Sequence, residues 1–124
     1  MYYKDLTPFE YNSAYTGLNI GWLNGSHSFP TGDPSEGFLD LLFATVSSGE
    51  YTRCAASGFH VCEICHRREV IAQLDGKEIV MGNTEIAIPF DGVEYVAPSL
   101  IYHYVKLHRY LPPDPFIKGV MATA

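Results

Sequence analysis

Two pairs of side chains in this sequence have the residue types and the spacing of metal ligands. Cys62 and Cys65 are separated by two residues, and His103 and His108 are separated by four. Two thiolates at this spacing in a tight turn can bind one ion, and two imidazoles on a helix can complete a tetrahedron around it. A cysteine pair followed by a histidine pair is typical of structural zinc sites, so the sequence predicts zinc bound by these four residues.

The spacing of the two histidines sets a geometric condition on this site. Residues five positions apart on an ideal helix are roughly 140° apart around its axis, so His103 and His108 can share an ion only if the last helical turn tightens. His60, two residues before Cys62, is a rival ligand, and so is His66. The helix histidines could instead be hydrogen-bonded core residues, and the cysteines could be partly buried thiols.

Other chemistries of the same motif are less well supported. Cys62-x-x-Cys65-His66 matches the attachment pattern of c-type haem, but that attachment needs export, and the N-terminus shows no apolar signal segment. A thioredoxin-like redox pair would open a helix, whereas a strand pattern follows here. With only three protein ligands, a zinc ion could be hydrolytic, and Glu63 or Glu69 would be the candidate general base.

Length and composition restrict the class of protein. The 124 residues predict one domain over residues 1–124, which can bury roughly two-thirds of its surface. The net charge of −6, from 8 basic and 14 acidic residues, argues against a nucleic-acid partner, because that binding relies on Lys and Arg at phosphates. No apolar run reaches membrane-spanning length. With three cysteines and no secretory signal, we expect a cytoplasmic protein without a disulfide framework.

Periodicity and turn residues predict the elements that position the ligands. In order, they are an irregular N-terminal arm (1–17), a strand (18–23), a helix (33–48), four strands (69–74, 78–81, 84–90 and 93–96), a helix (98–110) and a short helix (114–120). Asp33 and Pro34 mark the start of the first helix, and Pro98 marks that of the second. The hairpin signals Asp75-Gly76 and Asp91-Gly92 favour a four-stranded antiparallel meander. We therefore expect a single α+β domain, with the helices packed on one face of the sheet.

Several motifs spread over nearly the whole chain are specific in combination. They are Asp5-Leu6-Thr7-Pro8-x-Glu10-Tyr11, Leu18-Asn19-Ile20-Gly21-Trp22-Leu23, Phe29-Pro30-Thr31-Gly32, Gly58-Phe59-His60-x-Cys62-x-x-Cys65, Gly82-Asn83-x-Glu85-Ile86, Ala97-Pro98-x-Leu100-Ile101-x-His103-Tyr104-Val105 and His108-x-Tyr110-x-Pro112-Pro113-x-x-Phe116. With them the chain resembles a family of small, uncharacterised bacterial proteins described as a domain of unknown function.

The resemblance implies a shared site, because five motif positions coincide with the candidate ligands. These positions are His60, Cys62, Cys65, His103 and His108. The resemblance gives no motif role to His66 or to the third cysteine, Cys54. It implies no reaction, substrate or partner.

The leading interpretation is a non-catalytic, zinc-stabilised binding domain with a protein as its partner. A small zinc-dependent hydrolase with an open metal position is the alternative, and a metal-free structural domain is the second alternative. Zinc is preferred because thiolate and imidazole ligands together suit it, although iron and copper accept similar ligands. The sequence predicts neither a nucleic-acid partner nor a membrane anchor, and it does not indicate an oligomeric state.

Overall fold

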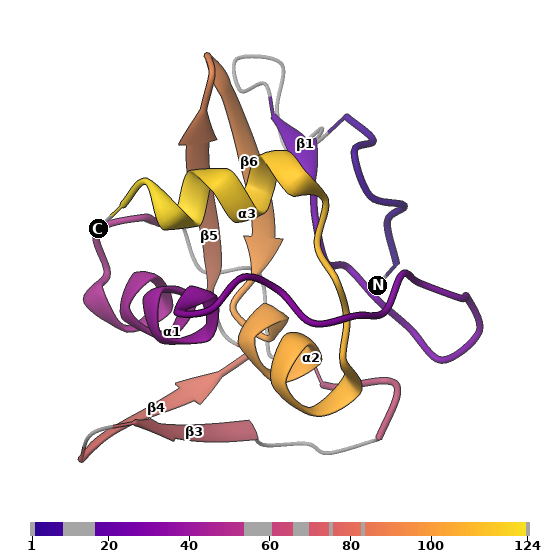
Figure 1. The fold of residues 1–124 in the computed structure, drawn as a ribbon. Helices are drawn as coiled ribbons and strands as arrows, with labels where there is room; N and C mark the ends of the chain where they lie inside the picture. Colours follow the sequence, from indigo (N-terminus) through magenta and orange to yellow (C-terminus); the bar gives the residue numbers. More distant parts are fainter. Residues whose placement is uncertain are drawn as a thin grey trace.

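The computed structural model describes residues 2–8, 17–53, 61–65, 70–74, 76–82 and 84–123, which form an α+β fold (Figure 1). Its strands are β1 (Leu18–Asn19), β2 (Thr52–Arg53), β3 (Val70–Leu74), β4 (Lys77–Met81), β5 (Glu85–Phe90) and β6 (Val93–Pro98). Its helices are α1 (Phe38–Ser48), α2 (Ile101–His108) and α3 (Asp114–Met121). None of these helices is long and apolar enough to cross a membrane. The set of strands and helices confirms the expected α+β class.

The β5–β6 hairpin is the centre of the larger sheet. Its strand order is β1-β6-β5-β2, with β1 parallel to β6 and the other pairs antiparallel. The hairpin turns at Asp91-Gly92, where both residues have positive φ angles of 52° and 80°. Two left-handed residues in sequence suit the two-residue turn that matches the twist of the flanking strands, as the Asp-Gly signal predicted.

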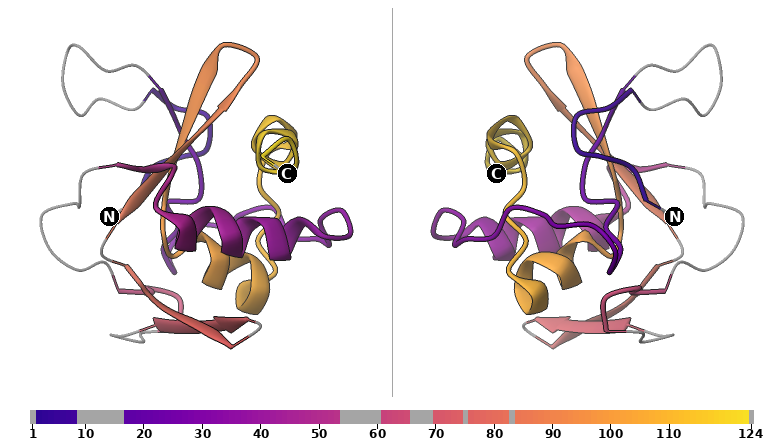
Figure 2. Two further views of the ribbon diagram at one scale, coloured as in Figure 1. Left: turned by 90° about the vertical axis from the view of Figure 1, so that its left-hand side faces the viewer. Right: turned by 90° about the vertical axis from the view of Figure 1, so that its right-hand side faces the viewer.

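The two faces of this sheet are covered by different parts of the chain. The helices lie on one face (Figure 2), and Ile86 and Ile88 of β5 join their buried core. Ala87 points the other way and forms a separate apolar cluster with Trp22 and Val96. The indole Nε1 of Trp22 donates to the carbonyl oxygen of Val96 at 3.1 Å. The helices therefore cover one face only, as expected, and Trp22 covers the other.

The expected four-stranded meander is wrong. Strands β3 and β4 pair with each other in a separate two-stranded sheet, at the end of the molecule where α2 lies (Figures 1 and 2). Both edges of the β5–β6 hairpin are instead taken by β1 and β2, from the first half of the chain. Between the sheets, Gly82 has a φ of 107° and its N–H donates to Ser99 Oγ at 2.8 Å. The Asp-Gly turn signals predicted where the two hairpins lie, but they did not predict that the hairpins belong to separate sheets.

The predicted starts of the first two helices are also wrong. Helix α1 begins at Phe38, after Gly37 with a φ of 84°, and not at Asp33. The segment before it runs beside the end of α2, where the Gly32 N–H donates to the Arg109 carbonyl at 3.1 Å and Arg109 lies 3.2 Å from the Asp33 carboxylate. Pro98 is the last residue of β6 and not the first of α2. The short helix expected at 114–120 is confirmed by α3.

We predict that Gly119→Ala destabilises the protein although alanine favours helices. A Cβ at residue 119 of α3 would lie 2.8 Å from Ile88 Cγ2 and 3.2 Å from Phe90 Cβ of β5. Overpacking of this kind costs about 1–3 kcal/mol. Urea unfolding measures the loss, and Lys118→Ala on the exposed side of α3 is the control, with a change below about 0.5 kcal/mol. An equal effect of the two substitutions would contradict the packing of α3 against β5.

Candidate metal centre

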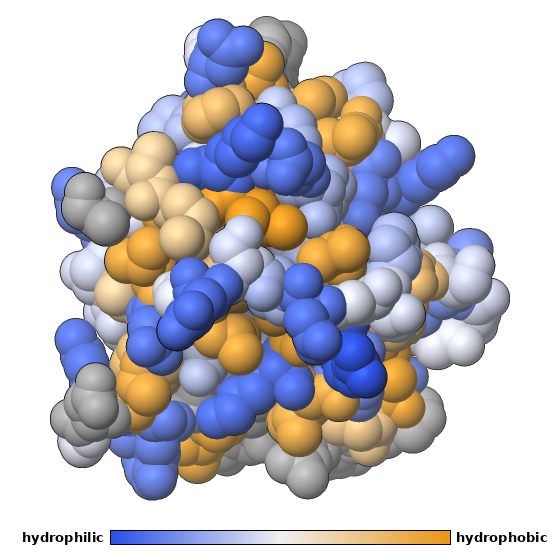
Figure 3. Space-filling view, viewed as in Figure 1, coloured by the Kyte–Doolittle hydropathy of each residue, from blue (hydrophilic) through white to orange (hydrophobic). Residues whose placement is uncertain are grey.

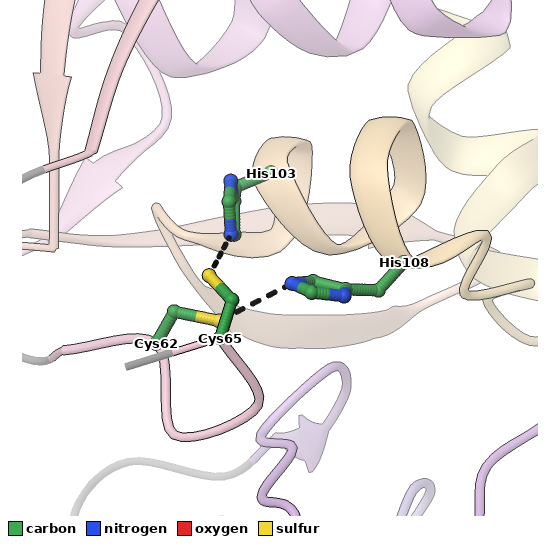
Figure 4. Close-up of side chains that lie close together, drawn as sticks. All are labelled: Cys62, Cys65, His103 and His108. Atoms are coloured by element: carbon green, nitrogen blue, oxygen red, sulfur yellow. Dashed lines mark hydrogen bonds between the residues drawn. The ribbon is translucent and has the colours of Figure 1, made fainter. Parts of the chain in front are cut away.

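The four predicted ligands converge on one point between α2 and the turn that contains the cysteines (Figure 4). Cys62 Sγ lies 3.4 Å from His108 Nε2, and Cys65 Sγ lies 3.4 Å from His103 Nε2. All four donor atoms lie within 4.8 Å of one another. Among the described residues, these four side chains form a group that could hold a metal ion. The structure thus brings together residues that are 38 and 46 positions apart in the chain.

The separations of the donor atoms suit a tetrahedral ion. Zinc binds thiolate sulfur at about 2.3 Å and imidazole nitrogen at about 2.0–2.1 Å, which places sulfur and nitrogen about 3.6 Å apart in a tetrahedron. The two observed separations of 3.4 Å are close to this value. The imidazole rings of His103 and His108 are nearly perpendicular, at 77°, with their centroids 4.9 Å apart. Each ring therefore points one Nε2 atom at the same small volume.

Helix α2 carries both histidines and ends at His108. The next residue, Arg109, is left-handed with a φ of 57°, and its N–H donates to the carbonyl of Tyr104. His103 is 2% exposed, while His108 lies at the partly exposed end of the helix. The predicted condition was a tightening of the last turn. The structure instead keeps both residues within α2, and their imidazole rings turn toward the same point (Figure 4).

The cysteine turn is packed against the protein on one side and open to solvent on the other. Cys62 is fully buried and belongs to the main apolar core, against which Ile64 also packs. Gly25 is close to the turn, since a Cβ there would lie 3.1 Å from the carbonyl oxygen of Glu63. Cys65 is exposed. The two thiols therefore differ strongly in their access to solvent.

Burial makes the site unfavourable for negative charge. Burial raises the pKa of the Cys62 thiol, and the neighbouring Cys65 thiol acts in the same direction, while backbone N–H groups of Cys65 and Ile64 oppose it. Burial also raises the pKa of the Tyr104 hydroxyl, and the charges of Cys62, Glu63 and Cys65 add to that effect. A bound dication would reverse this balance, because its positive charge stabilises the thiolates directly.

Most of the remaining candidates lie outside the part of the chain that the structure describes. His60, His66 and Glu69 lie outside the described residues, as does Cys54. His27 lies elsewhere, with its ring stacked on Tyr2 at 3.8 Å and its Nδ1 2.7 Å from Asn24 Oδ1. Among the described histidines, only the two on α2 belong to the cluster.

Sequence reasoning missed two residues that hold the end of α2. Tyr110 is fully buried, and its hydroxyl donates to Asp5 Oδ2 at 2.6 Å. The other carboxylate oxygen of Asp5 accepts a hydrogen bond from the Gly21 N–H at 2.9 Å. The Tyr110 N–H donates to the Tyr104 carbonyl at 3.1 Å. A signal was present, because all four residues fall within the sequence motifs, but their types alone did not suggest a shared network.

The fold and the cluster define a small α+β domain with two cysteines and two histidines that could hold a metal ion. The chain belongs to the family described as Domain of unknown function (DUF7919), which matches residues 1–121. No curated protein and no solved structure matches the chain. The expected membership in a domain family of unknown function is therefore confirmed.

We predict that the affinity of the protein for zinc rises with pH through the neutral range. A metal displaces protons from its thiol and imidazole ligands, and burial lets Cys62 keep its proton to higher pH than an ordinary thiol. Each displaced proton changes the affinity by about tenfold per pH unit. Competition with a chromophoric chelator at several pH values measures the slope. Cys62→Ser should lower both affinity and slope, whereas a pH-independent affinity would exclude the thiols as ligands.

Proposed function

We propose that Cys62, Cys65, His103 and His108 bind one zinc ion in a closed, structural site, and that the protein is a zinc-stabilised binding domain. The observation that carries this proposal is the convergence of two sulfur and two nitrogen donors within 4.8 Å. Mixed thiolate and imidazole donors in a tetrahedron favour zinc over the hard cations magnesium and calcium.

A structural role is favoured over a catalytic one by the number of donors. Catalytic zinc sites keep one position for water or substrate, whereas four protein ligands fill the tetrahedron. The ion would join the cysteine turn to α2, two parts of the chain that are distant in sequence, and its binding energy would become folding energy. The hydrolase alternative requires that one of the four residues leave the ion.

The exposed apolar residues beside the ligands support a binding role with a protein partner. Val61 precedes Cys62 and is 42% exposed, and Leu107 precedes His108 and is 55% exposed. A zinc ion would fix the backbone that carries both side chains. We also propose a cytoplasmic location, because the proposed site needs both thiols reduced and a reducing compartment keeps them so.

Elemental analysis of untagged protein, purified without chelator, tests the proposal. We expect about one zinc per chain, as in structural sites of this donor set. Cys62→Ser and His103→Ala should lose the zinc and lower Tm by at least about 10 °C, since each kcal/mol corresponds to roughly 4 °C in a domain of this size. His27→Ala, which removes a histidine outside the cluster, is the matched control and should keep the zinc.

The outcomes of this experiment separate the three interpretations. Zinc that is lost in the variants without a fall in Tm would favour the open, hydrolytic site. A wild-type protein that neither contains zinc nor takes it up would leave the metal-free structural domain.

Cobalt substitution tests whether the site is closed. Four protein donors should give the spectrum of a tetrahedral cobalt ion with thiolate ligands, and this spectrum should not change when azide or imidazole is added. A spectral change on adding either small ligand would show an open coordination position and contradict the structural role.

A further inference from the structure

We propose that hydrogen peroxide oxidises Cys62 and Cys65 to a disulfide and thereby expels the metal from the site. This inference rests on the proposed zinc site and assigns it a regulation. It would make the centre respond to a hydroperoxide, with the metal-bound form as the reduced state.

The unequal exposure of the two thiols is the first observation behind it. Cys65 is exposed, whereas Cys62 is fully buried. Oxidation of cysteine follows thiolate character and exposure, and metal coordination holds both sulfurs as thiolates. The Cys65 sulfur therefore reacts with peroxide first. Cys62 is protected from solvent but lies next to Cys65.

The geometry of the turn is the second observation. The two sulfurs lie within 4.8 Å of each other, and residues 63–65 between and at the end of the pair form a turn. The first and fourth residues of a tight turn have Cα atoms less than about 7 Å apart. A disulfide requires Cα atoms about 4.4–6.8 Å apart. The backbone can therefore accept the disulfide without a large movement.

The reaction proceeds in two balanced steps. The Cys65 thiolate attacks one oxygen of hydrogen peroxide, the O–O bond breaks, and hydroxide leaves and takes a proton to become water. The Cys62 thiolate then attacks the sulfur of the Cys65 sulfenic acid, the S–S bond forms, the S–O bond breaks, and a second hydroxide takes a proton. The sulfurs lose two electrons and the peroxide gains them.

Loss of the metal follows from the change in donors. The disulfide removes both thiolates, so only His103 and His108 remain, and two imidazoles do not hold zinc in a tetrahedral site. The bound ion would bridge the cysteine turn and α2, whose sulfur and nitrogen atoms lie 3.4 Å apart in both pairs. Expulsion of the ion removes this bridge. Reduction of the disulfide restores the four donors.

The test treats zinc-loaded protein with hydrogen peroxide and follows zinc release with a chromophoric chelator. We expect one zinc ion released for each Cys62–Cys65 disulfide found by peptide mapping, and zinc uptake again after reduction with a dithiol. The Cys54→Ser variant, which removes the third cysteine, should behave in the same way. Addition of dimedone during oxidation of the zinc-loaded wild type should label Cys65 before Cys62.

The outcomes distinguish this inference from the proposed function. Protein that takes up no zinc would refute the zinc site itself. Zinc-loaded protein that keeps its thiols and its zinc in peroxide would overturn only the redox inference. So would zinc release that accompanies a disulfide containing Cys54, and so would dimedone labelling of Cys62 before Cys65.

Discussion

The end of helix α2 is the constraint on which the rest of the site depends. Arg109 adopts a left-handed conformation, which costs a non-glycine residue roughly 1–2 kcal/mol. The surroundings stabilise it, because the fully buried Tyr110 next to it donates its hydroxyl to Asp5. His108 is the last residue of α2, so the reversal at Arg109 fixes the end of the helix that carries this ligand candidate. A strained residue and a buried hydrogen bond thus hold the end of a short helix directly beside one of the four residues of the cluster.

The same site also places opposing demands on Cys62. Its complete burial contributes apolar contacts with the core, but burial raises the pKa of its thiol and so disfavours the thiolate that a metal needs. A dication offsets this cost, because it supplies the missing positive charge inside the protein. Cys65, by contrast, is exposed to solvent. The two cysteines of one turn therefore differ in their surroundings. Cys62 would attach an ion to the apolar core, whereas Cys65 would bind it from the solvent-exposed side.

That Cys62, Cys65, His103 and His108 could form one metal site was predictable from the sequence, whereas the geometry of the cluster was not. Residue types and spacing in Cys62-x-x-Cys65 and His103-x-x-x-x-His108 are local properties, and so are the Asp-Gly turns that located the hairpins. The left-handed Arg109 is not predictable, since no propensity favours arginine there. The partition into two sheets depends on β1 and β2, which have two residues each. Strands that short show no periodicity, so their pairing with the β5–β6 hairpin is decided by tertiary contacts.

The parallel pairing of β1 with β6 has a consequence for the order of folding. Leu18 pairs with Tyr95, so closing this edge of the sheet requires a long loop, whereas the β5–β6 hairpin closes through its two-residue turn. Local contacts of the second kind form quickly, and long-range ones are slow because the loop entropy is lost before the contact forms. The sulfur and imidazole donors, 38 and 46 residues apart, belong to the slow group. An ion captured at this late stage would act mainly on the rate of unfolding, and would set how long the native state persists more than how fast it is reached.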